Sequence, residues 1–202
     1  MTNTGGKLET NAANLTVTSG SIDNTNKGSI AHAGSGKLTM NSGVVENSTG
    51  TIASNGEVAV SSSTLNNTSG SLASTKALSL TASGAVTNAR GSIVSSQQAT
   101  VKAQSLINTA GIIQALGAAD TTFTVADALT NTGGKLETNA ANLTVTSGSI
   151  ANTNQGHITH AGSGELSLSS GDIRNSDGAI TSNGAITLDI ASLINDGGGI
   201  TA

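Results

Sequence analysis

Three histidines are the side chains of this sequence best suited to bind a metal ion. His157 and His160 lie three residues apart, and His32 stands where His160 stands in an equivalent stretch of sequence. Residues three apart on a β-strand point to opposite faces, so His157 and His160 cannot converge on one ion. The repeat described below places His32 six layers from His160, or about 29 Å at the usual strand spacing. We therefore expect no metal site and interpret the histidines as exposed turn residues.

The twelve acidic residues would support glycan cleavage only if two of them met in one groove. Most occupy different positions of the repeat. Asp23 and Glu46 share a position, one residue before successive asparagines, and Arg174 occupies that position further along. We interpret Asp23 and Glu46 as a solvated pair of charges, with at most a weak cation site. The chain has no Trp or Tyr and one Phe, so it lacks aromatic platforms for sugar rings, and we expect neither an enzyme nor a cofactor.

Alternating threonines offer a third possible chemistry, the ordering of water against ice. Two copies of "LTVT" place pairs of threonines on an outer face. The same register runs through Thr124 and Ala126, and the charged side chains of Lys102 and Asp189 interrupt it. An ice-binding or polysaccharide-active protein is therefore the least favoured alternative.

Asparagine marks a repeat of 20 to 23 residues. The stretch "NTGGKLETNAANLTVTSGSI" at 3–22 returns unchanged at 131–150, six repeats later. The recurring residues are Asn3, Asn24, Asn47, Asn67, Asn88, Asn108, Asn131, Asn152, Asn175 and Asn195. Stacked at the strand spacing, each amide can donate to one neighbouring layer and accept from the other. We predict a buried asparagine ladder, in which replacing Asn88 by Ala lowers thermal stability more than replacing Ser95 by Ala.

Aliphatic residues keep a fixed register with the asparagines. One lies two residues before each Asn, one follows the Gly of the turn, and a pair at i, i+2 comes next, as in Leu78 and Leu80. The pair has the spacing of a strand with one buried face. We take Phe123 and Val125 as the pair of the sixth repeat, where Phe123 fills the space of a coil with three extra residues. Each repeat then holds about three short strand segments separated by turns.

A repeat of this length cannot bury its own apolar face and must stack on its neighbours. The sequence therefore predicts an all-β fold, a right-handed parallel β-helix (β-solenoid) of about 9–10 coils of 20–23 residues that begin near the ten asparagines. Residues 1–202 form one repeat segment, and the absence of Pro fits strands with neighbours on both sides. Because the last repeat is incomplete at Ala202, we expect a fragment of a longer rod, whose unpaired strand edges favour end-to-end association.

Charge and hydropathy exclude several partners. The formal net charge is −4, only 10% of the residues are charged, and no basic cluster occurs. Nucleic acid is therefore not an expected partner. No apolar run approaches the roughly 20 residues of a membrane span, so we expect no membrane insertion. Polar residues follow Met1 at once, and we expect no signal peptide in this segment.

The units "NTSGSLASTKALSLTASGAV" (67–86) and "NSTGTIASNGEVAVSSSTL" (47–65) combine all these features. They resemble the repeats of filamentous haemagglutinin-type exoproteins, which Gram-negative bacteria export by two-partner secretion. The resemblance covers the chain from Asn3 to Ala202. It implies a right-handed β-helical shaft that is secreted or held at the bacterial cell surface, and that serves adhesion by projecting a distal binding domain.

The resemblance also implies partners and one alternative function. The partners are the flanking repeats of the same exoprotein, an outer-membrane transporter during export, and a target-cell receptor bound by other regions. Several relatives are contact-dependent growth inhibition proteins, so the alternative is the stick region of such a toxin-delivery protein. Repeats of this type carry no catalytic residues, and none is assigned here.

Overall fold

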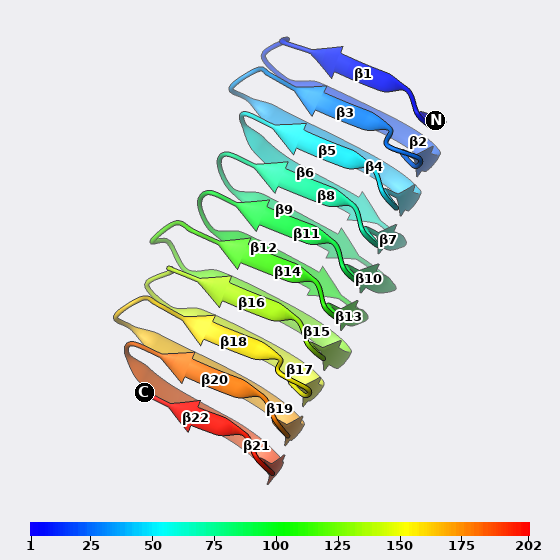
Figure 1. Ribbon diagram of the computed structural model, residues 1–202. Helices are drawn as coiled ribbons and strands as arrows, with labels where there is room; N and C mark the ends of the chain where they lie inside the picture. Colours follow the sequence, from blue (N-terminus) through cyan, green and yellow to red (C-terminus); the bar gives the residue numbers. More distant parts are fainter.

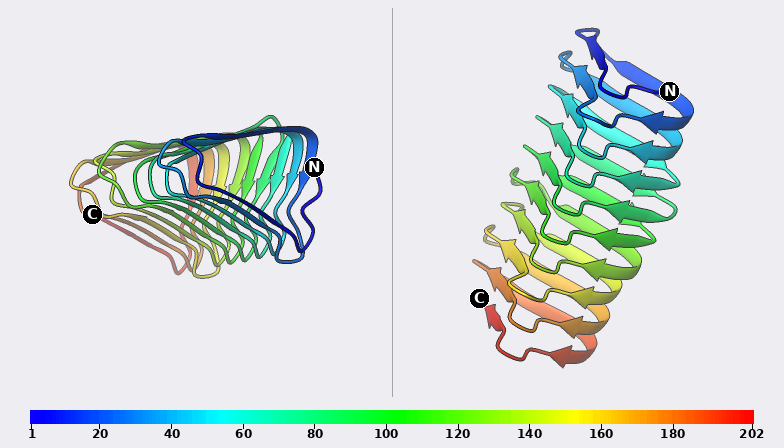
Figure 2. Two further views of the ribbon diagram at one scale, coloured as in Figure 1. Left: turned by 90° about the horizontal axis from the view of Figure 1, so that it is seen from above. Right: turned by 45° about the vertical axis from the view of Figure 1, so that its right-hand side comes forward.

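The chain folds as a β-solenoid, which confirms the predicted fold class. A computed structural model describes all 202 residues and contains 22 strands and no helix, so nothing in it has the length and apolar character of a membrane-crossing helix (Figure 1). Every strand pairing is parallel, and the two termini lie at opposite ends of the stack. Figure 2 shows the coils in succession, each with nearly the same outline.

Two sheets run the length of the rod. The short-strand sheet consists of β1 (Lys7–Thr10), β3 (Ser29–His32), β5 (Thr51–Ser54), β8 (Ser71–Ser74), β11 (Ser92–Ser95), β14 (Ile112–Ala115), β16 (Lys135–Thr138), β18 (His157–His160), β20 (Ala179–Ser182) and β22 (Gly199–Thr201). The long-strand sheet consists of β2 (Leu15–Asp23), β4 (Lys37–Glu46), β6 (Glu57–Ser62), β7 (Thr64–Asn66), β9 (Leu78–Ala82), β10 (Ala85–Thr87), β12 (Ala99–Ala103), β13 (Ser105–Ile107), β15 (Thr121–Thr130), β17 (Leu143–Ala151), β19 (Glu165–Arg174) and β21 (Ala185–Ile194).

The predicted division of each coil into three strand segments holds for three coils only. These are β5 to β7, β8 to β10 and β11 to β13. In the coils with β2, β4, β15, β17, β19 and β21, the second and third segments merge into one bent strand of 9 or 10 residues. Stacked glycines occupy several of the bends, and a Cβ on Gly43 would lie 2.7 Å from the carbonyl oxygen of Gly20. The backbones therefore approach at the bend more closely than a side chain would permit.

The interior is one continuous column of aliphatic side chains. A single core cluster of 34 buried residues runs through the coils, and partly buried residues such as Leu8 and Ile200 extend it at the two ends. Equivalent residues pair directly, as Ile30 does with Leu8 and with Ile52. Because every coil buries its inward side chains against both neighbours, the core gains apolar contact with each added layer.

The predicted register of the sixth coil is wrong by two residues. Phe123 pairs with Val101 and with Val145, so it is the second inward residue of its strand and Thr121, only 1% exposed, is the first. The extra residues of this coil precede the strand, and the sequence alone does not say on which side of the apolar pair they lie. On the adjacent strand β12, the small inward residues Ala99 and Ala103 flank Val101, the partner of Phe123.

The turn after each asparagine needs a left-handed backbone, but the asparagine itself does not supply it. The residue with positive φ lies two positions later, as at Thr49 (φ 59°) and Arg90 (φ 54°). In the coil that opens at Asn24, both Asn26 and Lys27 have positive φ, so one of the extra residues of that coil lies in this turn.

This turn yields a matched pair of substitutions. Thr49 and Gly133 (φ 61°) occupy equivalent, exposed positions. A left-handed conformation costs an L-residue roughly 1–2 kcal/mol, whereas Gly loses about 0.5–1 kcal/mol through its greater freedom when unfolded. We expect Thr49→Gly to stabilise the fold by about 0.5–1 kcal/mol and Gly133→Thr to destabilise it by a similar amount, in thermal unfolding followed by circular dichroism. Shifts of the same sign for the two variants would contradict this assignment.

Candidate functional site: the asparagine ladder and the rod surface

The ten asparagines form one column at the corner where each coil passes from the long-strand sheet to the short-strand sheet. The Nδ2 of each of the first nine donates to the Oδ1 of the next, at 2.6–2.8 Å. The same nitrogen also donates to a backbone carbonyl of the next coil, as Asn88 does to Ile112 at 3.0 Å. The eight from Asn24 to Asn175 are at most 1% exposed.

Every amide in the middle of the column therefore uses both of its hydrogens and its oxygen. A buried amide without partners would cost roughly 1–3 kcal/mol for each missing bond. The Gly that follows each asparagine belongs to the same arrangement: Gly91 N donates to the Asn88 carbonyl at 3.1 Å, and a Cβ on Gly91 would lie 2.6 Å from Asn88 Oδ1. The recurring spacing of Asn and Gly thus reflects both hydrogen bonding and lack of space.

A second polar column lies at the opposite end of the short strands, and the sequence analysis did not identify it. Its members are the last, inward residues of the first nine of these strands, and all but Ala115 are polar: Thr10, His32, Ser54, Ser74, Ser95, Ala115, Thr138, His160 and Ser182. Its hydroxyls accept the N–H of the residue two positions later, as Ser54 does from Gly56 at 3.0 Å. The signal was present in the sequence, because these residues recur in register with the asparagines.

Two of the histidines belong to this second column. His32 and His160 are each 1% exposed, so their interpretation as exposed turn residues is wrong. Both lie at the inward end of a strand, where the side-chain alternation directs the imidazole into the corner. His157 is exposed and points to the other face of β18. No three His, Cys, Asp or Glu side chains lie close enough together to hold a metal ion.

The acidic pair lies on adjacent strands. Asp23 pairs with Glu46 across β2 and β4. Asp23 Oδ1 accepts from Thr25 Oγ1 at 2.7 Å, and Glu46 Oε2 accepts from Asn66 Nδ2 at 2.8 Å. Arg174 is on β19, far along the rod. Each carboxylate thus accepts a hydrogen bond from a neighbouring polar side chain, as expected for acids at a solvated corner of the rod.

The corrected register of the sixth coil also changes the outer face. Thr122 and Thr124, rather than Thr124 and Ala126, stand beside Thr144 and Thr146. Four threonines thus face outward over two coils. Lys102 pairs with Thr124 at one side of this group, so the array of threonines is short.

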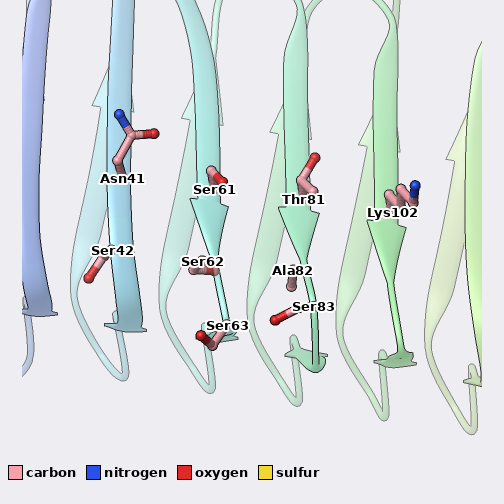
Figure 3. Close-up of a pocket in the computed structure, with 9 residues that line it drawn as sticks. All are labelled: Asn41, Ser42, Ser61, Ser62, Ser63, Thr81, Ala82, Ser83 and Lys102. Carbon is pink, nitrogen blue, oxygen red and sulfur yellow. The ribbon is translucent and has the colours of Figure 1, made fainter.

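A shallow groove of about 490 Å³ crosses the outer side of β4, β6, β9 and β12 (Figure 3). It is lined by Asn41, Ser42, Ser61, Ser62, Ser63, Thr81, Ala82, Ser83 and Lys102. Seven of these nine residues carry a hydroxyl or amide group, and the ammonium group of Lys102 is the one charge. The groove contains neither an acid–base pair nor an aromatic platform.

The comparison with known families decides what kind of repeat this is. A family model for the haemagglutinin repeat matches residues 1–90, 85–133 and 134–202. The chain belongs to the haemagglutinin repeat family. Members of this family are structural repeats of secreted, adhesin-type exoproteins. The match confirms the resemblance drawn from the repeat units. No curated protein and no solved structure matches the chain.

The ladder can be tested against a surface serine. Ser95 is not a suitable reference, because it is fully buried and its one hydroxyl hydrogen lies between two acceptors, Lys76 O and Gln98 O. Ser79 is exposed on β9 and pairs with Ala59 and Thr100, so alanine is already tolerated in its column. Asn88→Ala leaves ladder partners in two coils unpaired, and we expect a loss of about 3 kcal/mol, against less than about 0.5 kcal/mol for Ser79→Ala.

Thermal unfolding measures the difference. For a chain of this size, about 3 kcal/mol corresponds to a fall in Tm of roughly 6–12 °C. Equal shifts for Asn88→Ala and Ser79→Ala would show that the side-chain ladder does not contribute to stability.

Proposed function

We propose that this chain is a non-catalytic shaft segment of a secreted bacterial surface exoprotein, which projects a distal binding domain from the cell. The observation that carries the proposal is continuity: two sheets and one core run from the first coil to the last without a break. Adjacent coils are joined through both sheets and through the asparagine column. Bending the rod would strain all three sets of contacts at once.

The length of the rod follows directly from the number of repeats. Ten strands of the short-strand sheet span nine strand spacings, or about 43 Å. Each further repeat of about 20 residues would add about 4.8 Å, so the rod can be lengthened without any change in how its core packs.

The surface supports a display role better than a chemical one. Its only ion pairs are Lys7–Glu9 and Lys135–Glu137, which are equivalent positions of the two copies of the repeated stretch. Its groove is lined by hydroxyls and one ammonium group, as described above. We assign receptor binding to other regions of the exoprotein and export to an outer-membrane transporter.

Flanking repeats are the proposed direct partners. In the last complete coil, Leu193 is 42% exposed and Ile194 is 39% exposed. Asn195 Nδ2 donates to Gly198 O within its own turn. A further repeat stacked on this end would cover Leu193, whose equivalent Ile173 is fully buried, and would offer the next acceptor to Asn195.

Distances between pairs of spin labels test whether the shaft is stiff. Ser29, Ile112 and Ala179 belong to one outward column of the short-strand sheet, and the chain has no cysteine, so spin labels can be attached to introduced cysteine pairs. Four strand spacings separate Ser29 from Ile112 and seven separate it from Ala179, so we expect pulsed electron paramagnetic resonance to give backbone separations of about 19 Å and 34 Å. The distributions should be narrow and should broaden only in denaturant. A broad distribution for the longer pair in native buffer would exclude a stiff shaft.

A further inference from the structure

The chain contains two Asn-Gly dipeptides, and each lies beside one of the two buried histidines. Asn55-Gly56 follows β5, next to His32 on β3, and Asn183-Gly184 follows β20, next to His160 on β18. In Asn-Gly sequences the backbone nitrogen of glycine can attack the side-chain amide of asparagine with little steric hindrance, because glycine has no Cβ. Asparagine is for this reason a chemically labile residue.

Hydrogen bonds connect the attacking nitrogen to the imidazole. His32 Nε2 lies 3.0 Å from the Ala12 carbonyl, which can only accept, so Nε2 carries the hydrogen. In the neutral ring Nδ1 is then an acceptor, and the Ser54 hydroxyl donates to it at 2.9 Å. Ser54 Oγ in turn accepts the N–H of Gly56 at 3.0 Å. A continuous path for a proton leads from Gly56 through Ser54 to His32.

The second copy has the same geometry. His160 Nε2 donates to Ala140 O at 2.9 Å, and His160 Nδ1 lies 2.9 Å from Ser182 Oγ. Gly184 N donates to Ser182 Oγ at 3.1 Å. Both Asn-Gly dipeptides are therefore joined to a buried imidazole through one serine.

We propose that Asn55 and Asn183 are sites of intramolecular deamidation assisted by this relay. Gly56 N forms a bond to Asn55 Cγ while its proton passes to Ser54 Oγ and the serine proton passes to His32 Nδ1. The Cγ–Nδ2 bond then breaks, and the nitrogen leaves as ammonia with the proton returned by the imidazole. Water opens the resulting succinimide to aspartate or isoaspartate. One water is consumed and one ammonia is released.

The surroundings of Asn55 allow this reaction. Asn55 is exposed, and a shallow cavity of about 220 Å³ that is lined by His32, Ser54 and Asn55 gives water access. Asn55 Nδ2 donates to the Ala33 carbonyl at 3.1 Å, and this bond must open before attack. Gly56 is required by the fold, because a Cβ there would overlap the Gly36 carbonyl.

The product would alter the contact between two coils. The carboxylate of an aspartate cannot donate to the Ala33 carbonyl, and it adds a negative charge at the corner of the rod. An isoaspartate would in addition lengthen the backbone of the turn by one methylene. Deamidation thus weakens the junction between the His32 coil and the next coil.

Peptide mass mapping of the intact protein during incubation at neutral pH tests the proposal, since each conversion adds about one mass unit. We expect Asn55 and Asn183 to convert in the folded protein at least about ten-fold faster than in urea. Exposed asparagines without a following glycine, such as Asn11 and Asn41, serve as references and should remain unchanged. Absence of conversion at Asn55 and Asn183, or faster conversion in urea, would overturn the proposal.

Two variants separate the relay from mere exposure. His32→Thr introduces the residue found at Thr10 and Thr138 in the same column, and Ser54→Ala introduces the residue found at Ala115. Each should slow the conversion of Asn55 at least about ten-fold, while Asn183 in the same molecule keeps its rate as an internal control. Loss of the relay and an opened corner would both slow Asn55 toward the urea rate in His32→Thr, so Ser54→Ala, which retains the imidazole, decides between them. An unchanged Asn55 rate in Ser54→Ala would contradict a relay.

Discussion

The structure depends on one constraint: each side chain lies about 4.8 Å from its equivalents in the coils before and after it. Aliphatic groups meet this condition by packing, and amides meet it by donating in one direction and accepting in the other, as Asn67, Asn88 and Asn108 do. Charged groups do not, since equal charges in a column would repel, and only 10% of the residues are charged. The composition that looks like low complexity is thus the composition that a stacked column tolerates.

Turns absorb the differences in coil length, so the inward rows stay in register along the rod. One extra residue of the Asn24 coil sits in a turn with two left-handed residues, others lie between β3 and β4, and the extra residues of the Asn108 coil precede β15. Only the path between the rows changes, by a bend in a long strand or by a break between two short ones. A shaft built in this way can vary in local shape while the asparagine column and the core remain continuous.

The fold class and most inward positions followed from the sequence, because stacking repeats the same weak pattern ten times. The failures have particular causes. The predicted register at Phe123 was wrong by two residues, because extra residues can lie on either side of an apolar pair. For His32 and His160, the three-residue spacing from His157 to His160 showed that the two point to opposite faces but not which one is inward. Ser95 was a poor reference for the ladder because it belongs to the second polar column, whose recurrence in register with the asparagines was overlooked.

Side-chain amide hydrogen exchange, followed by nuclear magnetic resonance, tests the stacked column most directly. The account predicts slow exchange for the eight asparagines from Asn24 to Asn175, with nuclear Overhauser contacts between amides of successive coils. Exposed Asn11 and Asn41 should exchange rapidly in the same sample. Exchange of the eight amides as fast as that of Asn11, without contacts between coils, would contradict the stacking of equivalent residues.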